Sequence, residues 1–138
     1  MPILIISDPE TGKSERIELE EARMSSLTGH KIGDIIDGAT VNMEGRKLEF
    51  TGGTDKDGIP MRPDVHGMAK VDILLRGNVG YKPKNKGERK RKLVRGNTIS
   101  RDTTYLNFVI VETPQSQKNQ SQQEEEEEQE QEETNQEE

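Results

Sequence analysis

The chain alternates between short apolar runs and polar turns, a pattern typical of short β-strands. Residues 3–6 are four consecutive aliphatic residues, and the polar turn 8–12 separates them from residues 14–19, where apolar and polar positions alternate. These two runs are expected to pair as a hairpin. Residues 104–111 (TYLNFVIV) combine aromatic and β-branched side chains, which predicts the strongest strand of the chain.

More short strands are predicted between these ends. They are expected, from alternating or aliphatic positions, at 35–36, 41–43, 48–50, 69–75, 93–94 and 98–99. Asp37-Gly38 is a dipeptide typical of a hairpin turn. Residues 20–27 are the best helix candidate, because acids occupy the first turn and Gly29 follows the last apolar residue. Many short strands with one short helix indicate a mainly β fold, namely a small β-barrel-like domain.

Composition divides the 138 residues into two parts. Only 28% are hydrophobic and 34% are charged, whereas globular chains average roughly 45–50% and 25%. The deviation is concentrated in residues 114–138, a Gln/Glu-rich stretch with ten Glu and one Lys. Residues 1–113 are therefore predicted to form the folded domain, with a charge of +2, and 114–138 to form a disordered acidic tail of charge −9.

The segment 76–101 concentrates positive charge in a chain whose net charge is −7. It holds ten Lys/Arg and a single acid, Glu88, so its formal charge is +9. A solvated loop usually mixes both signs, and a nuclear import signal usually lies in a disordered tail, so polyanion binding is favoured. Pro83 and four glycines predict an extended arm whose cations lie along phosphates. Tyr81 is expected either to stack on a base or to join the core.

The RNA-binding candidates are the arm's ten cations and one more from the preceding loop. They are Arg62, Arg76, Lys82, Lys84, Lys86, Arg89, Lys90, Arg91, Lys92, Arg95 and Arg101.

Residues 51–61 contain three glycines, two aspartates and a proline, which predicts a tightly shaped turn. Asp55 and Asp57 resemble the start of a calcium loop, but the further ligands and the bidentate Glu are missing from the sequence. A nucleotide-binding loop would need Gly-Lys-Ser/Thr and a following helix. The turn is therefore expected to be structural, and its backbone amides, together with Arg62, are a candidate second contact with RNA.

Other classes of function find little support in the sequence. The chain has no cysteine and only two histidines, His30 and His66, so neither disulfides nor a metal site are expected. His66 is expected to be a hydrogen-bonding loop residue. No combination of residues suggests catalysis, and no apolar run approaches the roughly 20 residues that cross a membrane. We expect no enzymatic activity, cofactor, small-molecule substrate or membrane association.

Two separated blocks carry a resemblance to a known family. Residues 50–61 (FTGGTDKDGIPM) and the block formed by 81–83, 87–92 and 94–96 resemble the ribosomal protein S6e family of archaeal and eukaryotic small subunits. The residues that carry the first block are Gly52, Gly53, Asp55, Gly58, Pro60 and Met61. The resemblance implies a β-barrel-like fold, a cytoplasmic location on the small ribosomal subunit, rRNA as ligand and neighbouring ribosomal proteins as partners.

The short length is similar to that of archaeal members of this family. Eukaryotic members continue into a long basic helix ending in phosphorylated serines, whereas this chain carries a Gln/Glu tail, so that regulation is not implied. Two alternatives stay open at this point. One is a non-ribosomal RNA-binding module in RNA processing or ribosome assembly, and the other is an enzyme that depends on His66.

Overall fold

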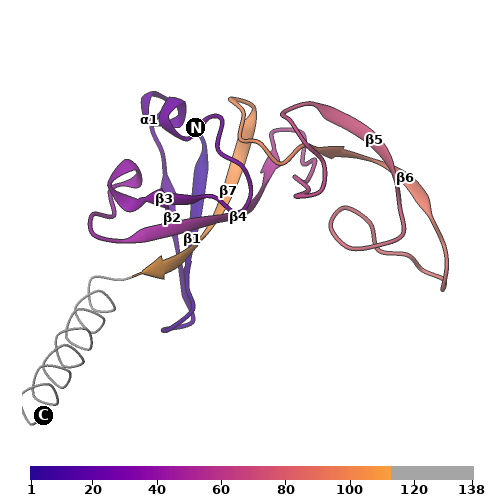
Figure 1. Ribbon diagram of the computed structural model, residues 1–138, viewed down its shortest axis with the longest axis horizontal. Coiled ribbons are helices and arrows are strands. Elements are labelled where there is room, and N and C mark those ends of the chain that lie inside the picture. Colours follow the sequence, from indigo (N-terminus) through magenta and orange to yellow (C-terminus); the bar gives the residue numbers. More distant parts are fainter. Residues whose placement is uncertain (113–138) are drawn as a thin grey trace, which may run out of the picture.

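The computed structural model describes residues 1–112, which are mainly β-strands (Figure 1). The strands are β1 (Ile3–Asp8), β2 (Lys13–Glu18), β3 (Ile35–Asp37), β4 (Lys47–Asp55), β5 (Lys70–Leu75), β6 (Lys90–Arg95) and β7 (Thr103–Glu112). One helix, α1 (Glu21–Leu27), follows β2, and the 3-10 helix η1 (Gly38–Val41) follows β3. The predicted mainly β fold with one short helix is confirmed, while the tail predicted at 114–138 lies outside the described residues.

Five strands form the main sheet, in the order β2-β1-β7-β4-β3. β1 and β2 form the predicted antiparallel hairpin, whereas β1 and β7 pair in parallel although they lie at opposite ends of the described chain. β7 occupies the centre of the sheet and pairs along almost its whole length with β4. The strongest strand pattern in the sequence thus marks the strand on which the sheet is assembled.

One face of the main sheet carries the hydrophobic core. The cross-strand partners Ile6, Phe108 and Phe50 lie on this face, and the two aromatic rings are tilted with their centroids 5.3 Å apart. Leu27 of α1 and Val41 of η1 are fully buried in the same core cluster. Alternation along the strands therefore places every second side chain under the helices and leaves the intervening ones on the opposite face.

β5 and β6 form a separate two-stranded antiparallel sheet, which we call the hairpin. It projects from one end of the main sheet, on the right of Figure 1. Residues 76–89 connect its two strands as a long loop of turns and bends. The predicted arm 76–101 is therefore partly strand, because residues 90–95 pair with β5, and the rest of it contains no helix.

The sheets are open and do not close into a barrel. Within residues 1–112, β2 and β3 are the two edges of the main sheet and do not pair with each other, and the hairpin strands pair only with each other and with residue 61. Closure requires every strand to have two partners. The short three-residue strand β3 and the two-stranded hairpin leave edges that the expected barrel would not have.

The segment after β3 differs from the prediction. Residues 41–43 were expected to be a strand, and Asp37-Gly38 to be a tight hairpin turn. Instead the Asp37 carboxylate accepts a hydrogen bond from the backbone N–H of Ala39 and caps η1. Asn42, which follows the last residue of η1, has a left-handed conformation. Gly38 is required here, since a Cβ would lie 2.1 Å from the backbone oxygen of Met43. β3 and β4 still pair, but through a nine-residue connection, 38–46.

Candidate nucleic-acid interface

Strand β6 presents cations on both faces of the hairpin. Cross-strand partners share a face, so Lys90 and Lys92 lie on the face of Leu75 and Ile73, and Arg91 lies on the other face. Lys90 and Arg91 are exposed, and Lys92 is partly buried. The hairpin therefore offers positive charge from either side, as a narrow element inserted between phosphate backbones would.

The loop between β5 and β6 adds a second group of cations. Arg76, Lys82, Lys84, Lys86 and Arg89 are all exposed. Within residues 1–112, none of these five side chains and none of Lys90, Arg91 and Lys92 forms an ion pair with an acid. Their charge is not neutralised inside the described protein, so it is available to an external polyanion.

Glu88, the single acid of the arm, shapes this loop. Its carboxylate accepts hydrogen bonds from the backbone N–H groups of Lys84 and Asn85, at 3.2 and 3.3 Å. Partial burial and the nearby Glu88 carboxylate raise the pKa of Tyr81 above its ordinary value. Glu88 thus closes a turn that spaces the neighbouring lysines. Tyr81 is partly buried, so its exposure is intermediate between that of a core residue and that of a ring free to stack on a base.

Arg95 has an internal role. It is 5% exposed, and its guanidinium pairs with the buried Asp55 carboxylate and, at 3.5 Å, with Asp102. Burial by itself raises the pKa of Asp55, but the hydrogen bond from Lys70 and the charge of Arg95 outweigh it, so the pKa lies below its usual value. The charge of Arg95 is therefore used within the fold, and Arg95 does not belong to the exposed set.

Arg62 also pairs internally. Its Nε and Nη2 donate to the two carboxylate oxygens of Asp64, each at 2.9 Å, and Nη1 donates to the backbone oxygen of Val79 at 2.6 Å. These hydrogen bonds hold the pKa of Asp64 below its usual value. Since Val79 belongs to the loop 76–89, Arg62 fixes the base of the arm's loop onto the turn that follows the signature residues.

The signature residues 52–61 join the main sheet to the hairpin. The N–H of Met61 donates to the oxygen of Gly53 at 3.0 Å, and the oxygen of Pro60 accepts from the N–H of Arg95 at 2.9 Å. A Cβ at Gly53 would lie 2.4 Å from the backbone oxygen of Tyr105, so only glycine allows this approach of β4 to β7. Gly58 has φ +79° in the exposed turn between Asp55 and Pro60.

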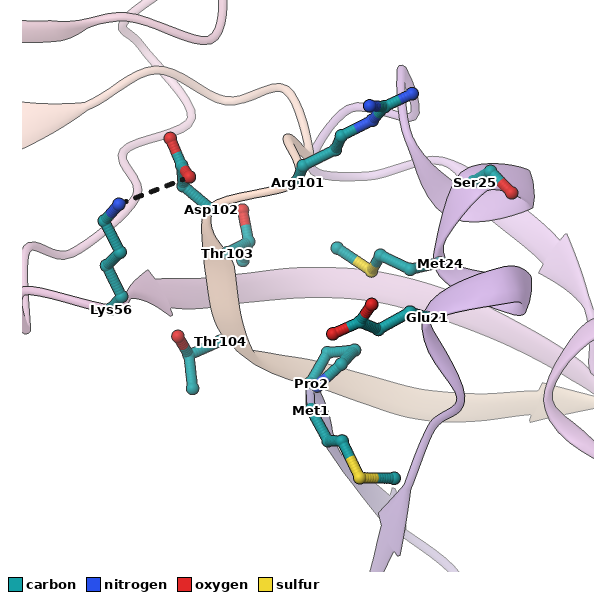
Figure 2. Close-up of a pocket in the computed structure, with 10 residues that line it drawn as sticks. All are labelled: Met1, Pro2, Glu21, Met24, Ser25, Lys56, Arg101, Asp102, Thr103 and Thr104. Atoms are coloured by element: carbon teal, nitrogen blue, oxygen red, sulfur yellow. Dashed lines mark hydrogen bonds and ion pairs between the residues drawn. The ribbon is translucent and has the colours of Figure 1, made fainter.

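Arg101 lies in a different part of the molecule. It lines a cavity of about 530 Å³ with residues of the N-terminus, α1 and the turn before β7 (Figure 2). The Lys56 ammonium and the Asp102 carboxylate pair at 3.5 Å on one side, and the side chains of Glu21 and Met24 converge from α1 (Figure 2). The sequence did not predict this cavity, because its lining comes from four segments far apart in the chain.

His66 was predicted to be a hydrogen-bonding residue of a loop. It does lie in a loop, but the predicted hydrogen bond is wrong for the described residues. The ring of His66 is exposed in the connection between β4 and β5, and makes no hydrogen bond within residues 1–112. In the same range, no group of three or more His, Asp or Glu side chains could hold a metal ion. No described helix is long and apolar enough to cross a membrane.

The acidity of Asp55 gives a testable pH dependence. Its pKa is lower in the folded than in the unfolded chain, so the stabilisation from its ionised form is complete above about pH 4 and is lost as pH falls below that value. The difference in unfolding free energy between the wild type and Asp55→Asn should therefore shrink between pH 6 and pH 3. Urea unfolding at both pH values measures it. An unchanged difference would contradict the ion pair.

A β scaffold that presents many unpaired cations on a projecting hairpin has the features of a structural RNA-binding protein. Residues 3–122 match the family described as Ribosomal protein S6e, and the chain belongs to this family. As a member it is a structural, non-enzymatic protein.

Several curated proteins that are similar to this chain are named small ribosomal subunit protein eS6. That of Methanocaldococcus jannaschii is 49% identical over 108 residues, covering 78% of this chain and 80% of the relative. That of a Methanococcus maripaludis strain is 50% identical over 109 residues (79% and 86%), and that of Archaeoglobus fulgidus is 48% identical over 110 residues (79% and 85%).

Proposed function

We propose that this protein is a structural constituent of the small ribosomal subunit and binds rRNA through its hairpin and the loop 76–89. Membership of the family supports a structural role in translation. The relatives, which are archaeal, are named small ribosomal subunit proteins, which supports a place in an archaeal, cytoplasmic ribosome. Its partners there are rRNA and neighbouring ribosomal proteins.

The observation that carries the rRNA contact is the set of unpaired cations on one projection. Of the nine candidates on the hairpin and its loop, all but Arg95 have no acidic partner within residues 1–112; these eight are Arg76, Lys82, Lys84, Lys86, Arg89, Lys90, Arg91 and Lys92. Each phosphate that such a cation neutralises releases counterions from the RNA, and this release favours binding at low salt. We assign to these eight residues the phosphate contacts that position the protein on rRNA.

The other three candidates have different parts in the proposal. Arg62 and Arg95 hold the arm in position and do not contact phosphates, because their charges are paired with Asp64 and Asp55. Arg101 forms no ion pair within the described chain and lies on the exposed rim of the cavity, so it is a candidate second contact. The tip of the signature turn is exposed, and there Lys56 and the backbone of Gly58 are open to RNA.

Sedimentation tests the proposed place of the protein. The tagged chain, expressed in an archaeal host, should sediment with small ribosomal subunits at moderate salt and leave them as salt is raised. A chain that never sediments with small subunits would contradict the ribosomal role and would favour an RNA-processing module instead.

The charge of the tail leads to a prediction about nonspecific binding. Residues 114–138 carry −9 and the arm carries +9, so the tail is expected to compete with RNA for the arm. Removing residues 114–138 should raise the affinity for random RNA by about threefold at 0.05 M salt and much less at 0.5 M, where screening is strong. Filter binding measures both. A chain with the ten tail glutamates changed to glutamine should behave like the truncation, and equal affinities of all three chains would exclude the competition.

A further inference from the structure

The hairpin is joined to the main sheet through a two-residue bridge. Residues 60–61 lie between β4 and β6: Thr54 pairs with Pro60 on one side, and Met61 pairs with Arg95 on the other. The N–H of Arg62 also donates to the oxygen of Arg95 at 3.0 Å. Backbone pairing therefore runs from the main sheet through this bridge into the hairpin, and rotation of the hairpin would have to break it.

Two segments of the chain connect the main sheet to the hairpin, one before β5 and one after β6, and hydrogen bonds join them to each other. The N–H groups of Gly96, Asn97 and Thr98 donate to oxygens of the segment 65–69, at 3.2, 2.7 and 3.1 Å. The approach is so close that a Cβ at Gly96 would lie 1.9 Å from the backbone oxygen of Gly67. These two connecting segments are thus held together by hydrogen bonds along several residues.

A buried ion pair lies inside this junction. Asp55 is the last residue of β4 and Arg95 is the last residue of β6, so their ion pair joins a strand end of the main sheet to a strand end of the hairpin. Lys70, the first residue of β5, reaches the same carboxylate at 3.1 Å. The carboxylate of Asp55 therefore contacts both strands of the hairpin where they meet the main sheet.

The pair is a poor choice if only stability mattered. Asp55 Oδ1 and Arg95 Nε are buried and have no hydrogen-bond partner within residues 1–112. Well-packed apolar residues often replace such pairs without loss of stability, and the best-attested use of a buried polar pair is to select one arrangement among several. The directional contact of Arg95 with Asp55 defines one angle between sheet and hairpin, which an apolar contact would not.

We propose that the junction is a rigid elbow that aims the cationic hairpin at its rRNA site, with Asp55 and Arg95 as positioning residues. The elbow comprises Gly53, Asp55, Pro60 and Met61 of the signature segment, the segment 95–98 and Lys70. This inference rests on the proposed rRNA binding. In this proposal the signature residues set the orientation of the arm. Orientation matters because a surface of fixed charges matches a folded RNA only in one orientation.

The test compares two variants that remove one negative charge from the same turn. Asp55 is buried and pairs with both Arg95 and Lys70, one residue from each strand of the hairpin. Asp57 is exposed, and within residues 1–112 its carboxylate pairs with Lys70 alone. Electrostatics alone predicts that both Asp55→Asn and Asp57→Asn bind RNA slightly more tightly, because each protein becomes more positive. If the elbow aims the hairpin, the two variants should change the affinity for folded rRNA in opposite directions.

We expect Asp55→Asn to bind archaeal small-subunit rRNA about tenfold more weakly than the wild type, and to bind unstructured poly(U) as the wild type does. The slope of log K against log salt should not change, since no exposed cation is lost. Asp57→Asn should match or exceed the wild type on both RNAs. Equal rRNA affinities of the two variants would overturn the proposal, and so would an equal loss by Asp55→Asn on both RNAs.

A second variant and a second measurement keep the test decisive if Asp55→Asn does not fold. Asp55→Leu with Arg95→Met replaces the pair by apolar side chains, and the same affinities are then expected for it as for Asp55→Asn. The chain has no cysteine, so spin labels at Glu15→Cys and Asn85→Cys report the angle directly. Distances between them should form one narrow distribution in the wild type and a broad one in the variant; equal widths would overturn the elbow.

Failure of the elbow and failure of rRNA binding are distinguishable. If the arm does not bind rRNA, serine substitutions in the arm itself leave binding and its salt dependence unchanged. If only the elbow is wrong, those substitutions still weaken binding while Asp55→Asn does not.

Discussion

Replacing Arg89, Lys90, Arg91 and Lys92 together by serine should flatten the salt dependence of rRNA binding by about three units of slope. If the wild-type arm contacts about six phosphates, log K should fall with log salt at a slope of about −4 to −5, and four lost contacts remove most of it. Affinity at 0.1 M salt should drop by about a hundredfold or more, since counterion release contributes most at low salt. Filter binding from 0.05 to 0.5 M salt measures both quantities.

A charge-matched control separates the arm from net charge. Lys13, Arg16, Lys31 and Arg46 lie on the main sheet and its connections, away from the hairpin strands. Their replacement by serine lowers the protein charge by the same four units and should leave the slope nearly unchanged. Equal slopes of the two fourfold variants would mean that the hairpin is not the contact surface.

Asp55→Ala should destabilise the protein by about 3–5 kcal/mol, the largest effect that we expect from a single substitution. It leaves Arg95 buried, and the one remaining acidic partner of Arg95 among residues 1–112 is the half-exposed Asp102 at 3.5 Å. Arg95→Ala should cost less, because Lys70 still compensates the Asp55 carboxylate at 3.1 Å. Urea unfolding at pH 7 measures the two free energies.

The matched control is Asp57→Ala, which removes an exposed acid of the same turn and should cost less than about 1 kcal/mol. Asp55→Leu combined with Arg95→Met should recover most of the stability lost in Asp55→Ala. Loss of less than 1 kcal/mol in Asp55→Ala would mean that the pair does not hold the junction.

Local patterns in the sequence predicted much of the fold. The aromatic and β-branched run at 104–111 became the central strand β7, and the aliphatic run at 3–6 became β1 beside it. These patterns are reliable because strands with one buried face must alternate, and a centrally buried strand must be rich in large apolar residues. The prediction failed at 41–43, where Asp37 caps a 3-10 helix that alternation alone does not distinguish from a strand.

The pattern of apolar and polar residues could not predict whether the sheets close into a barrel. Short alternating strands occur in open sheets and in barrels alike, and only the pairing of edges decides between them. Here β2 and β3 stay unpaired along one side each, and the hairpin is attached through residues 60–61. That attachment depends on residues 53, 61 and 95, which are distant in sequence and meet only in the fold.

The charge of segment 76–101 indicated a site for a polyanion. Nine of its ten cations have no acidic partner in the described chain, and eight of these nine are exposed. Charge counting did not distinguish Arg95 from these eight, because burial depends on the register of β6 against β5 and on the position of Asp55. The same holds for Arg62, whose partners Asp64 and Val79 come from two different loops. A cation in a basic segment is a phosphate contact only if no acid of the fold reaches it.

The most direct test is photo-crosslinking from the arm to rRNA inside assembled small subunits. A cysteine-reactive crosslinker at Asn85→Cys, in the loop between β5 and β6, should attach to small-subunit rRNA, because this position lies among the unpaired cations. The same crosslinker at Glu15→Cys, on the outer strand β2, should yield little rRNA adduct. Strong rRNA adducts from position 15 and none from position 85 would contradict the account.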